Sequence, residues 1–181
     1  SYYGITPQGN FEGKSIPNLL NSEFPEEERQ QIEAMRLKLF DSRSQRVAPF
    51  KDDKILLSWN GFMIAALALG GRAFNEPLYI EKAQAALAFM ESHMRVGGRY
   101  MLRYRDGEAA HPALAEDYAA LVWGLLEMHR STLKPSYLQK ALQVNAEMVN
   151  LFWDEEQYAF LYYGKDSEQL LINPREVYDG A

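Results

Sequence analysis

The chain has 181 residues, of which 47% are hydrophobic and 24% are charged; this is the composition of an ordinary globular protein and excludes a disordered or low-complexity chain. Its formal charge of −6, from 25 acidic and 19 basic residues without a dense basic cluster, argues against a nucleic-acid partner. Because the chain has no cysteine, it offers no disulfide framework, thiolate metal site or thiol nucleophile.

Targeting and cofactor signals are also missing from the sequence. The longest apolar stretch, residues 55–69, is interrupted by Ser58, Asn60 and Gly61 and is too short for a membrane span. The first residues lack the basic and apolar regions of a signal peptide, and no metal-binding or phosphate-binding spacing occurs. We therefore expect a cytoplasmic protein with no membrane partner, metal or cofactor. The lack of an initiator Met suggests a piece of a longer protein.

The first part of the chain is expected to be irregular. Residues 1–24 hold three glycines and two prolines, spaced so that no regular element can run for long, and they are interpreted as a lead-in or linker. A helix is predicted over 25–44, because Pro25 suits a first turn and the three glutamates that follow complement the helix dipole. Its predicted apolar stripe consists of Ile32, Met35, Leu39 and Phe40.

Two helices and a hairpin are predicted next. Residues 54–74 are apolar nearly all round and rich in small side chains, which is typical of a buried helix. Residues 77–95 begin with Pro77 and form an amphipathic helix. The alternating residues 100–105, followed by Asp106-Gly107, predict a β-hairpin.

The same series then recurs with an offset of 58 residues. A buried helix is predicted over 115–130, an amphipathic helix over 135–152, and a hairpin from 158–163 and 169–172 around Gly164-Lys165. Pro77 falls on Pro135 and Tyr104 on Tyr162 when 58 is added to their numbers. The repeats are placed at 59–116 and 117–174, with a truncated third repeat after them.

Alternating buried and amphipathic helices predict an all-α fold of two concentric rings, an α/α toroid over residues 25–181. A period of 58 is longer than that of the common helical solenoids. Short hairpins would join each outer helix to the next inner one, so that all of them lie at the end that carries the N-termini of the inner helices.

Polar and aromatic residues gather at the two predicted inner-helix starts, and this combination suits a carbohydrate. Aromatic side chains can stack on sugar rings, while carboxylates and amides bind hydroxyls. Acids at helix starts can equally be caps without any chemistry. The candidate acid/base residues are Asp52, Asp53, Glu116 and Asp117, and the candidate substrate-binding residues are Trp59, Asn60, Arg99 and Tyr118.

At these residues the sequence resembles the family of thioredoxin-domain-containing proteins that includes bacterial YyaL and spermatogenesis-associated protein 20. The resemblance implies a thioredoxin-like domain, absent from this chain, followed by an (α/α)6 toroid of the six-hairpin glycosidase kind. Six units of 58 residues exceed this chain, so we expect about half of the ring. The segments that carry the resemblance are 9–14, 52–56, 58–61, 116–119 and 178–181.

Three interpretations remain open at this point. The first is a carbohydrate-binding or carbohydrate-processing domain, hydrolase-like or epimerase-like. The second is a non-enzymatic module that binds a protein for the attached thioredoxin-like domain. The third is that the acids are caps and the chain has no activity of its own. Expected partners are a carbohydrate or other small molecule, the missing half of the toroid, the thioredoxin-like domain and a second copy in a homodimer.

Overall fold

The computed structural model describes residues 2–20 and 25–167. The chain divides into an N-terminal unit, Ser1–Lys51, and a C-terminal unit, Asp52–Ala181. This division differs from the boundary expected after residue 24, because the helix predicted over 25–44 belongs to the N-terminal unit. None of the helices among the described residues is long and apolar enough to cross a membrane.

The N-terminal unit contains helix α1, Glu26–Ser44. Pro25 precedes the first turn of the helix, which carries three glutamates. Further along, Arg36 forms an ion pair at 2.6 Å with Glu33, which lies one turn earlier in the helix. The predicted apolar stripe is not buried: none of the helix residues is, and Leu39 is 71% exposed. The helix therefore gains its local stability from its dipole and its ion pair rather than from a core.

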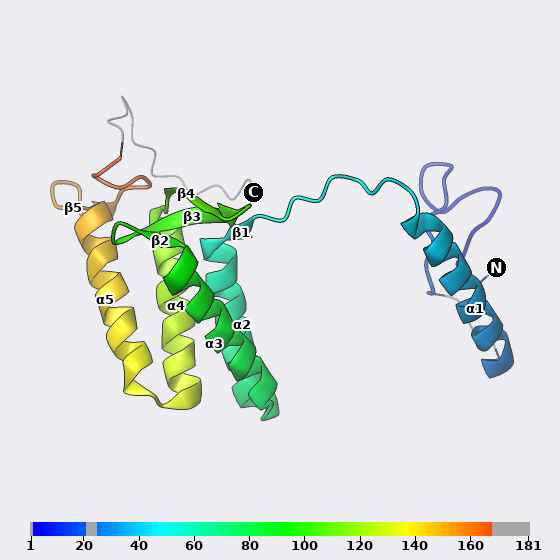
Figure 1. Ribbon diagram of the computed structural model, residues 1–181, viewed down its shortest axis with the longest axis horizontal. Helices are drawn as coiled ribbons and strands as arrows, with labels where there is room; N and C mark the ends of the chain where they lie inside the picture. The colour runs from blue at the N-terminus through cyan, green and yellow to red at the C-terminus, as the bar shows by residue number, and fades with distance from the viewer. Residues whose placement is uncertain (1, 21–24, 168–181) are drawn as a thin grey trace. The chain divides into compact units, whose positions relative to one another are not determined.

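The C-terminal unit is built from four helices that stand side by side (Figure 1). Each of the two outer helices begins with a proline at its first position, as the sequence predicts. The helices are α2 (Leu57–Phe74), α3 (Pro77–His93), α4 (Ala115–Thr132) and α5 (Pro135–Phe152).

Short antiparallel strands lie at the end where α2 and α4 begin (Figure 1). The Asp106-Gly107 turn, with positive φ at both residues, joins β3 to β4 and confirms the first hairpin. Of the second predicted hairpin, residues 169–172 lie outside the described residues, and within the described part β6 pairs with β5. The strands are β1 (Ile55–Leu56), β2 (Arg95–Val96), β3 (Arg99–Arg105), β4 (Glu108–Pro112), β5 (Trp153–Asp154) and β6 (Ala159–Phe160).

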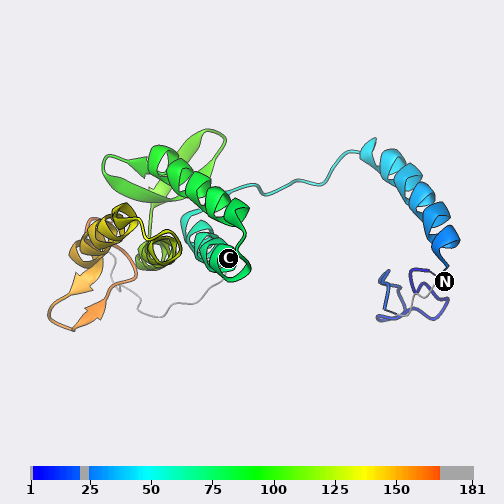
Figure 2. The same ribbon diagram turned by 90° about the horizontal axis from the view of Figure 1, so that it is seen from below.

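The helix boundaries follow the 58-residue offset. Helix α2 begins at 57 and α4 at 115, while α3 begins at 77 and α5 at 135. Both α2 and α4 end in a left-handed residue, Asn75 and Leu133, which are also 58 residues apart. Helices α2 and α4 lie next to each other, with α3 against α2 and α5 against α4 (Figure 2), as expected for inner and outer helices.

Glycines allow α2 and α4 to approach closely. A Cβ placed on Gly61 would lie 2.7 Å from the carbonyl carbon of Ala120, and one on Gly124 would lie 2.9 Å from the Gly61 oxygen. On either side of this contact, Ile64 and Leu121 are almost completely buried. The core of the C-terminal unit is therefore centred on the α2–α4 contact.

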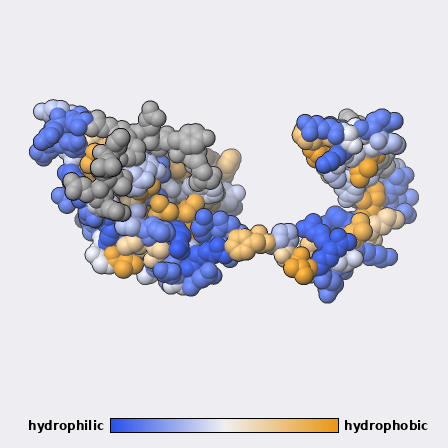
Figure 3. Space-filling model, turned by 90° about the horizontal axis from the view of Figure 1, so that it is seen from above, coloured by the Kyte–Doolittle hydropathy of each residue, from blue (hydrophilic) through white to orange (hydrophobic). Residues whose placement is uncertain are grey.

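Helix α2 is buried on one side rather than all round. The side that faces α4 includes Ala65 and Ala68, at 1% and 0% exposure, whereas Trp59, Phe62 and Met63 are about half exposed. The apolar character of both sides suggested complete burial, but α4 and α3 cover only part of the helix circumference. Seen from the strand end, hydrophilic residues dominate the surface and separate several apolar patches (Figure 3).

Candidate functional site

Asp117 links the N-termini of the two inner helices. Its side chain is 1% exposed, and its carboxylate accepts hydrogen bonds from the backbone N–H of Ser58 at 3.1 Å and of Leu114 at 2.8 Å. Burial raises the pKa of the Asp117 carboxyl above its ordinary value, although these hydrogen bonds act in the opposite direction. The capping interpretation of this acid therefore fits its surroundings better than an acid/base role.

Three further candidates also serve the fold. Tyr118 is completely buried between the rings of Tyr100 and Phe152, so it has no face to offer a sugar ring. Arg99 pairs with Asp166 at 2.9 Å and donates to the Ala113 carbonyl at 3.0 Å. Asn60 donates its side-chain N–H to the Leu56 carbonyl at 2.8 Å, within the first turn of its own helix.

Asp52 and Asp53 lie in a solvated cluster of charges at the tip of the first hairpin. Both are more than half exposed, and Arg105 contacts Asp53 at 3.1 Å and Asp52 at 3.6 Å. Partial burial acts to raise the pKa of Asp52, but the hydrogen bonds and the charge of Lys54 outweigh it and hold that pKa below its ordinary value. These carboxylates are ion-paired and do not face Asp117, which is buried.

Trp59 is 53% exposed and is therefore open to a ligand. Its repeat counterpart is Asp117 (59 + 58), and Asp117 contacts α2 from the neighbouring helix. The sequence prediction expected Trp59, Asp53 and Asp117 to line one cleft. The structure does not bring them together, because Asp117 is buried against α2 whereas Trp59 and Asp53 are exposed.

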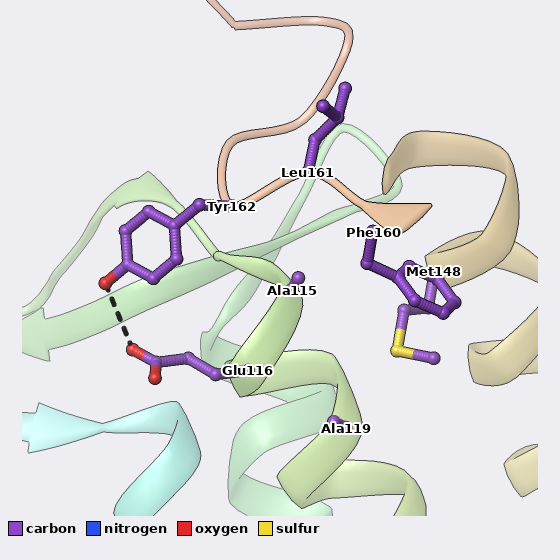
Figure 4. A pocket seen from close by; sticks show the side chains of 7 residues that line it. All are labelled: Ala115, Glu116, Ala119, Met148, Phe160, Leu161 and Tyr162. Carbon is purple, nitrogen blue, oxygen red and sulfur yellow. Dashed lines mark hydrogen bonds between the residues drawn. The ribbon is translucent and has the colours of Figure 1, made fainter. Parts of the chain in front are cut away.

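Glu116 is the predicted acid that lines a cavity. The cavity has a volume of about 250 Å³ and lies where α4 begins. The Tyr162 hydroxyl faces Glu116 at 3.4 Å, and Phe160 and Met148 form an apolar wall beside them (Figure 4). Its lining residues are Ala115, Glu116, Ala119, Met148, Phe160, Leu161 and Tyr162.

The cavity has the character of an amphipathic small-molecule site. Burial and the negative charge of Glu116 raise the pKa of the Tyr162 phenol above its ordinary value, so this hydroxyl remains a hydrogen-bond donor at neutral pH. Tyr162 and Phe160 are absent from the predicted site residues. The repeat offset gave a signal for Tyr162, because Tyr104 is its counterpart. The part of the chain that the structure describes contains no cluster of potential metal ligands.

Sequence comparison places the chain among relatives of known name, although no family profile matches it. Human spermatogenesis-associated protein 20 is 29% identical over 86% of this chain, and the mouse protein of the same name is 32% identical over 65% of it. An uncharacterised protein of Caenorhabditis elegans is 26% identical over 99% of the chain. The chain spans only 23%, 16% and 28% of the length of these relatives.

Solved structures with a similar fold act on sugars. A sugar epimerase from a ruminal bacterium matches 64% of this chain with a TM-score of 0.59 and 11% identity, and cellobiose 2-epimerase from Bacillus thermoamylovorans matches 69% with a TM-score of 0.57 and 17% identity. The GH76 alpha-mannanase of Bacteroides thetaiotaomicron matches 62% with a TM-score of 0.53 and 22% identity. The chain covers 32–34% of each of these structures, and identities this low show the fold alone.

These findings confirm the resemblance and the fold class predicted from the sequence. The chain is a relative of spermatogenesis-associated protein 20, and its C-terminal unit is part of an α/α toroid of the kind found in sugar epimerases and glycosidases.

Proposed function

We propose that this chain is part of a carbohydrate-binding or carbohydrate-processing domain and that the sugar occupies the cavity at the start of α4. The observation that carries the proposal is the pairing of Glu116 and Tyr162 opposite the apolar wall of Phe160 and Met148. The similar toroids are sugar epimerases and a mannanase by name. A thioredoxin-like domain elsewhere in the longer protein and a cytoplasmic location belong to the same proposal.

The chemistry of the cavity suits one sugar ring. A sugar presents hydroxyls around its edge and C–H groups on its faces, so a carboxylate and a phenol can bind the edge while an aromatic and a thioether contact a face. At about 250 Å³ the cavity lies just below the usual range of ligand pockets, roughly 300–1,000 Å³. We therefore expect a monosaccharide or the end of a longer chain.

The number of carboxylates favours binding or proton transfer over glycoside hydrolysis. Hydrolysis by the common mechanisms uses two carboxyl groups, about 5–10 Å apart. Among the described residues that line the cavity, Glu116 is the single acid. One carboxylate with a phenol beside it can hold a hydroxyl or move a proton at carbon next to a sugar carbonyl, which is the step that an epimerisation needs.

The test is ligand-observed NMR with a panel of monosaccharides, together with exchange of sugar C–H for deuterium in D₂O. We expect binding that weakens about tenfold or more in Glu116→Gln, because the charged hydrogen-bond acceptor is lost. Tyr162→Phe should weaken binding by less. Glu156→Gln, at an exposed position in the β5–β6 turn, is the matched control and should bind normally. Absence of binding to every sugar, or full binding by Glu116→Gln, would refute the proposal.

A further inference from the structure

A second cavity is bordered by the last turns of α5 and by the β2–β3 turn, residues 97–98. It has a volume of about 290 Å³ and shares no lining residue with the cavity of Glu116. We call it the turn cavity and define it by the charged and amide side chains that line it, Arg99, Glu147, Asn150 and Asp166. All of its lining residues belong to the C-terminal unit, so this chain forms the cavity by itself.

Arg99 brings an unused N–H group to the turn cavity. Its Nε donates to Asp166 at 2.9 Å, and its Nη2 donates to the Ala113 carbonyl at 3.0 Å. The guanidinium also lies over the rings of Tyr118 and Phe152, 5.2 Å from each ring centre. The remaining nitrogen, Nη1, is buried and has no hydrogen-bond partner among the described residues. A guanidinium that is held firmly in place therefore keeps one charged donor for a ligand.

Glu147 supplies an unused acceptor at the same cavity. Its Oε1 accepts hydrogen bonds from Arg95 at 2.7 Å and from Gln143 at 3.1 Å. Its Oε2 is buried and finds no partner in the part of the chain that the structure describes. Rotation about the last bond of a glutamate side chain is soft, so this oxygen can turn toward the cavity that the side chain lines. Because unpaired buried donors and acceptors cost stability, a ligand that pairs with both gains affinity.

The charges around the turn cavity cancel. Asp166 compensates the charge of Arg99, and Arg95 compensates that of Glu147. A ligand with a net charge would therefore bring an uncompensated charge into a partly buried space, which is costly. The expected ligand has no net charge, and it carries both an acceptor for Arg99 and a donor for Glu147.

We propose that the turn cavity binds a small zwitterion of the α-amino acid class, with its carboxylate on Nη1 of Arg99 and its ammonium on Oε2 of Glu147. Hydrogen bonds that involve charged groups are roughly twice as strong as those between neutral groups, which favours a zwitterion over an uncharged polyol. The Asn150 amide, which lines the same cavity, has both a donor and an acceptor and suits either end of the ligand.

The size of the cavity limits the ligand to a single small amino acid. At about 290 Å³ it lies just below the usual range of ligand pockets, roughly 300–1,000 Å³. A charged side chain on the ligand would also disturb the balance of charges around the cavity. We therefore expect glycine, L-alanine or L-serine to bind better than larger or charged amino acids.

The test is two-dimensional NMR of the isotope-labelled chain, read at the side-chain amide signal of Asn150. This signal is identified by its loss in Asn150→Ala, whereas Asn145→Ala, at an exposed position on the same helix, should leave it in place. Titration with L-alanine should shift the signal. N-acetyl-L-alanine lacks the ammonium and L-alaninamide lacks the carboxylate, so each should bind at least about tenfold more weakly. Myo-inositol, an uncharged polyol, should leave the signal unchanged.

Glu147→Gln tests the acceptor in the protein. The new amide can still accept from Arg95 with its oxygen, but it then presents an N–H group where Oε2 stood. The affinity for L-alanine should fall about tenfold or more, because the ligand's ammonium meets a donor. Glu81→Gln, at an exposed position on α3, is the matched control and should bind L-alanine normally. Urea denaturation shows whether the Glu147 variant is folded, and the comparison of ligands tests the proposal even where it is not.

Four results would overturn the inference. These are an Asn150 signal that no amino acid shifts, equal binding of L-alanine and either of its singly charged analogues, full affinity in a folded Glu147→Gln variant, and tighter binding of myo-inositol than of L-alanine at this cavity. Sugar binding without any amino-acid binding would refute this inference alone, whereas amino-acid binding without any sugar binding would refute the proposed function alone.

Discussion

The close contact of α2 and α4 gives the most direct test of the fold, through the variant Gly61→Ala. The new Cβ would lie 2.7–2.9 Å from three backbone atoms of Ala120 and Leu121. Ordinary contacts begin near 3.4 Å, so the helices would have to separate by about 0.7 Å, the difference between 3.4 and 2.7 Å. Backbone atoms inside a helix cannot give way individually, and the whole α2–α4 contact must open.

The expected cost follows from two opposing effects. A gap of 0.5–1 Å loses roughly a quarter to a half of the dispersion attraction across it, which places the cost near the upper end of the 1–3 kcal/mol that is typical of overpacking. Replacement of glycine by alanine within a helix stabilises by up to about 1 kcal/mol. We therefore expect Gly61→Ala to lose about 2 kcal/mol of unfolding free energy.

Urea denaturation followed by tryptophan fluorescence measures this change, because all three tryptophans lie in the C-terminal unit. The midpoint should fall while the slope of the transition stays constant. Gly70→Ala is the matched control in the same helix: its Cβ would meet a side-chain carbon of Tyr79 at 3.3 Å, and this ring can shift. The control should be neutral or slightly stabilising. A Gly61→Ala variant as stable as the wild type would show that the close approach of the helices is wrong.

Three further predictions concern the ends of the inner helices. Leu133 has φ of 55° and is 77% exposed, and its counterpart is Asn75; Leu133→Asn should raise the unfolding free energy by roughly 0.5–1 kcal/mol in the same assay, whereas Leu133→Ala should change it little. Asp117→Ala should lower it by about 1–3 kcal/mol, because the N–H groups of Ser58 and Leu114 lose their buried acceptor. The pKa of Asp117 in the folded protein lies above its ordinary value of 3.8, so the folded protein binds this proton more tightly than the unfolded chain does. The unfolding free energy of wild type relative to Asp117→Asn should therefore fall as the pH rises from about 3.8 through that raised pKa. A difference in unfolding free energy that does not change with pH would contradict the direction of the pKa shift.

Helix positions could be predicted from the sequence because local signals and the repeat agreed. Pro77 and Pro135 mark two helix starts, and Asp106-Gly107 marks a turn. The β5–β6 turn has no such signal, since it has positive φ at Tyr158 rather than at a glycine. Gly164 suggested the turn of the second hairpin, and a turn does begin there, since the Ser167 N–H donates to the Gly164 carbonyl at 2.9 Å. The strand expected after this turn, residues 169–172, lies outside the described residues.

The candidate site was harder to predict, because a repeat reveals which positions are equivalent and not which are adjacent. Asp117 and Trp59 are equivalent, and this equivalence suggested a common cleft. In the folded chain, the Asp117 carboxylate contacts the helix of the preceding repeat, whereas the Trp59 side chain is 53% exposed. Adjacency depends on the direction in which successive inner helices pack, and the amino-acid pattern alone does not contain that direction.

The two neighbouring acids at the start of α4 illustrate how a repeated backbone acquires a site. Successive helical residues point about 100° apart, so Asp117 turns toward α2 and caps it, while Glu116 turns toward the cavity. In the first repeat the same two positions hold Trp59 and Ser58. The backbone therefore repeats while the side chains at these two positions differ. The proposed site depends on one of these differences, the glutamate at 116 where the first repeat has Ser58. Because Asp117 is needed for packing, the substitutions that separate fold from function are those at Glu116.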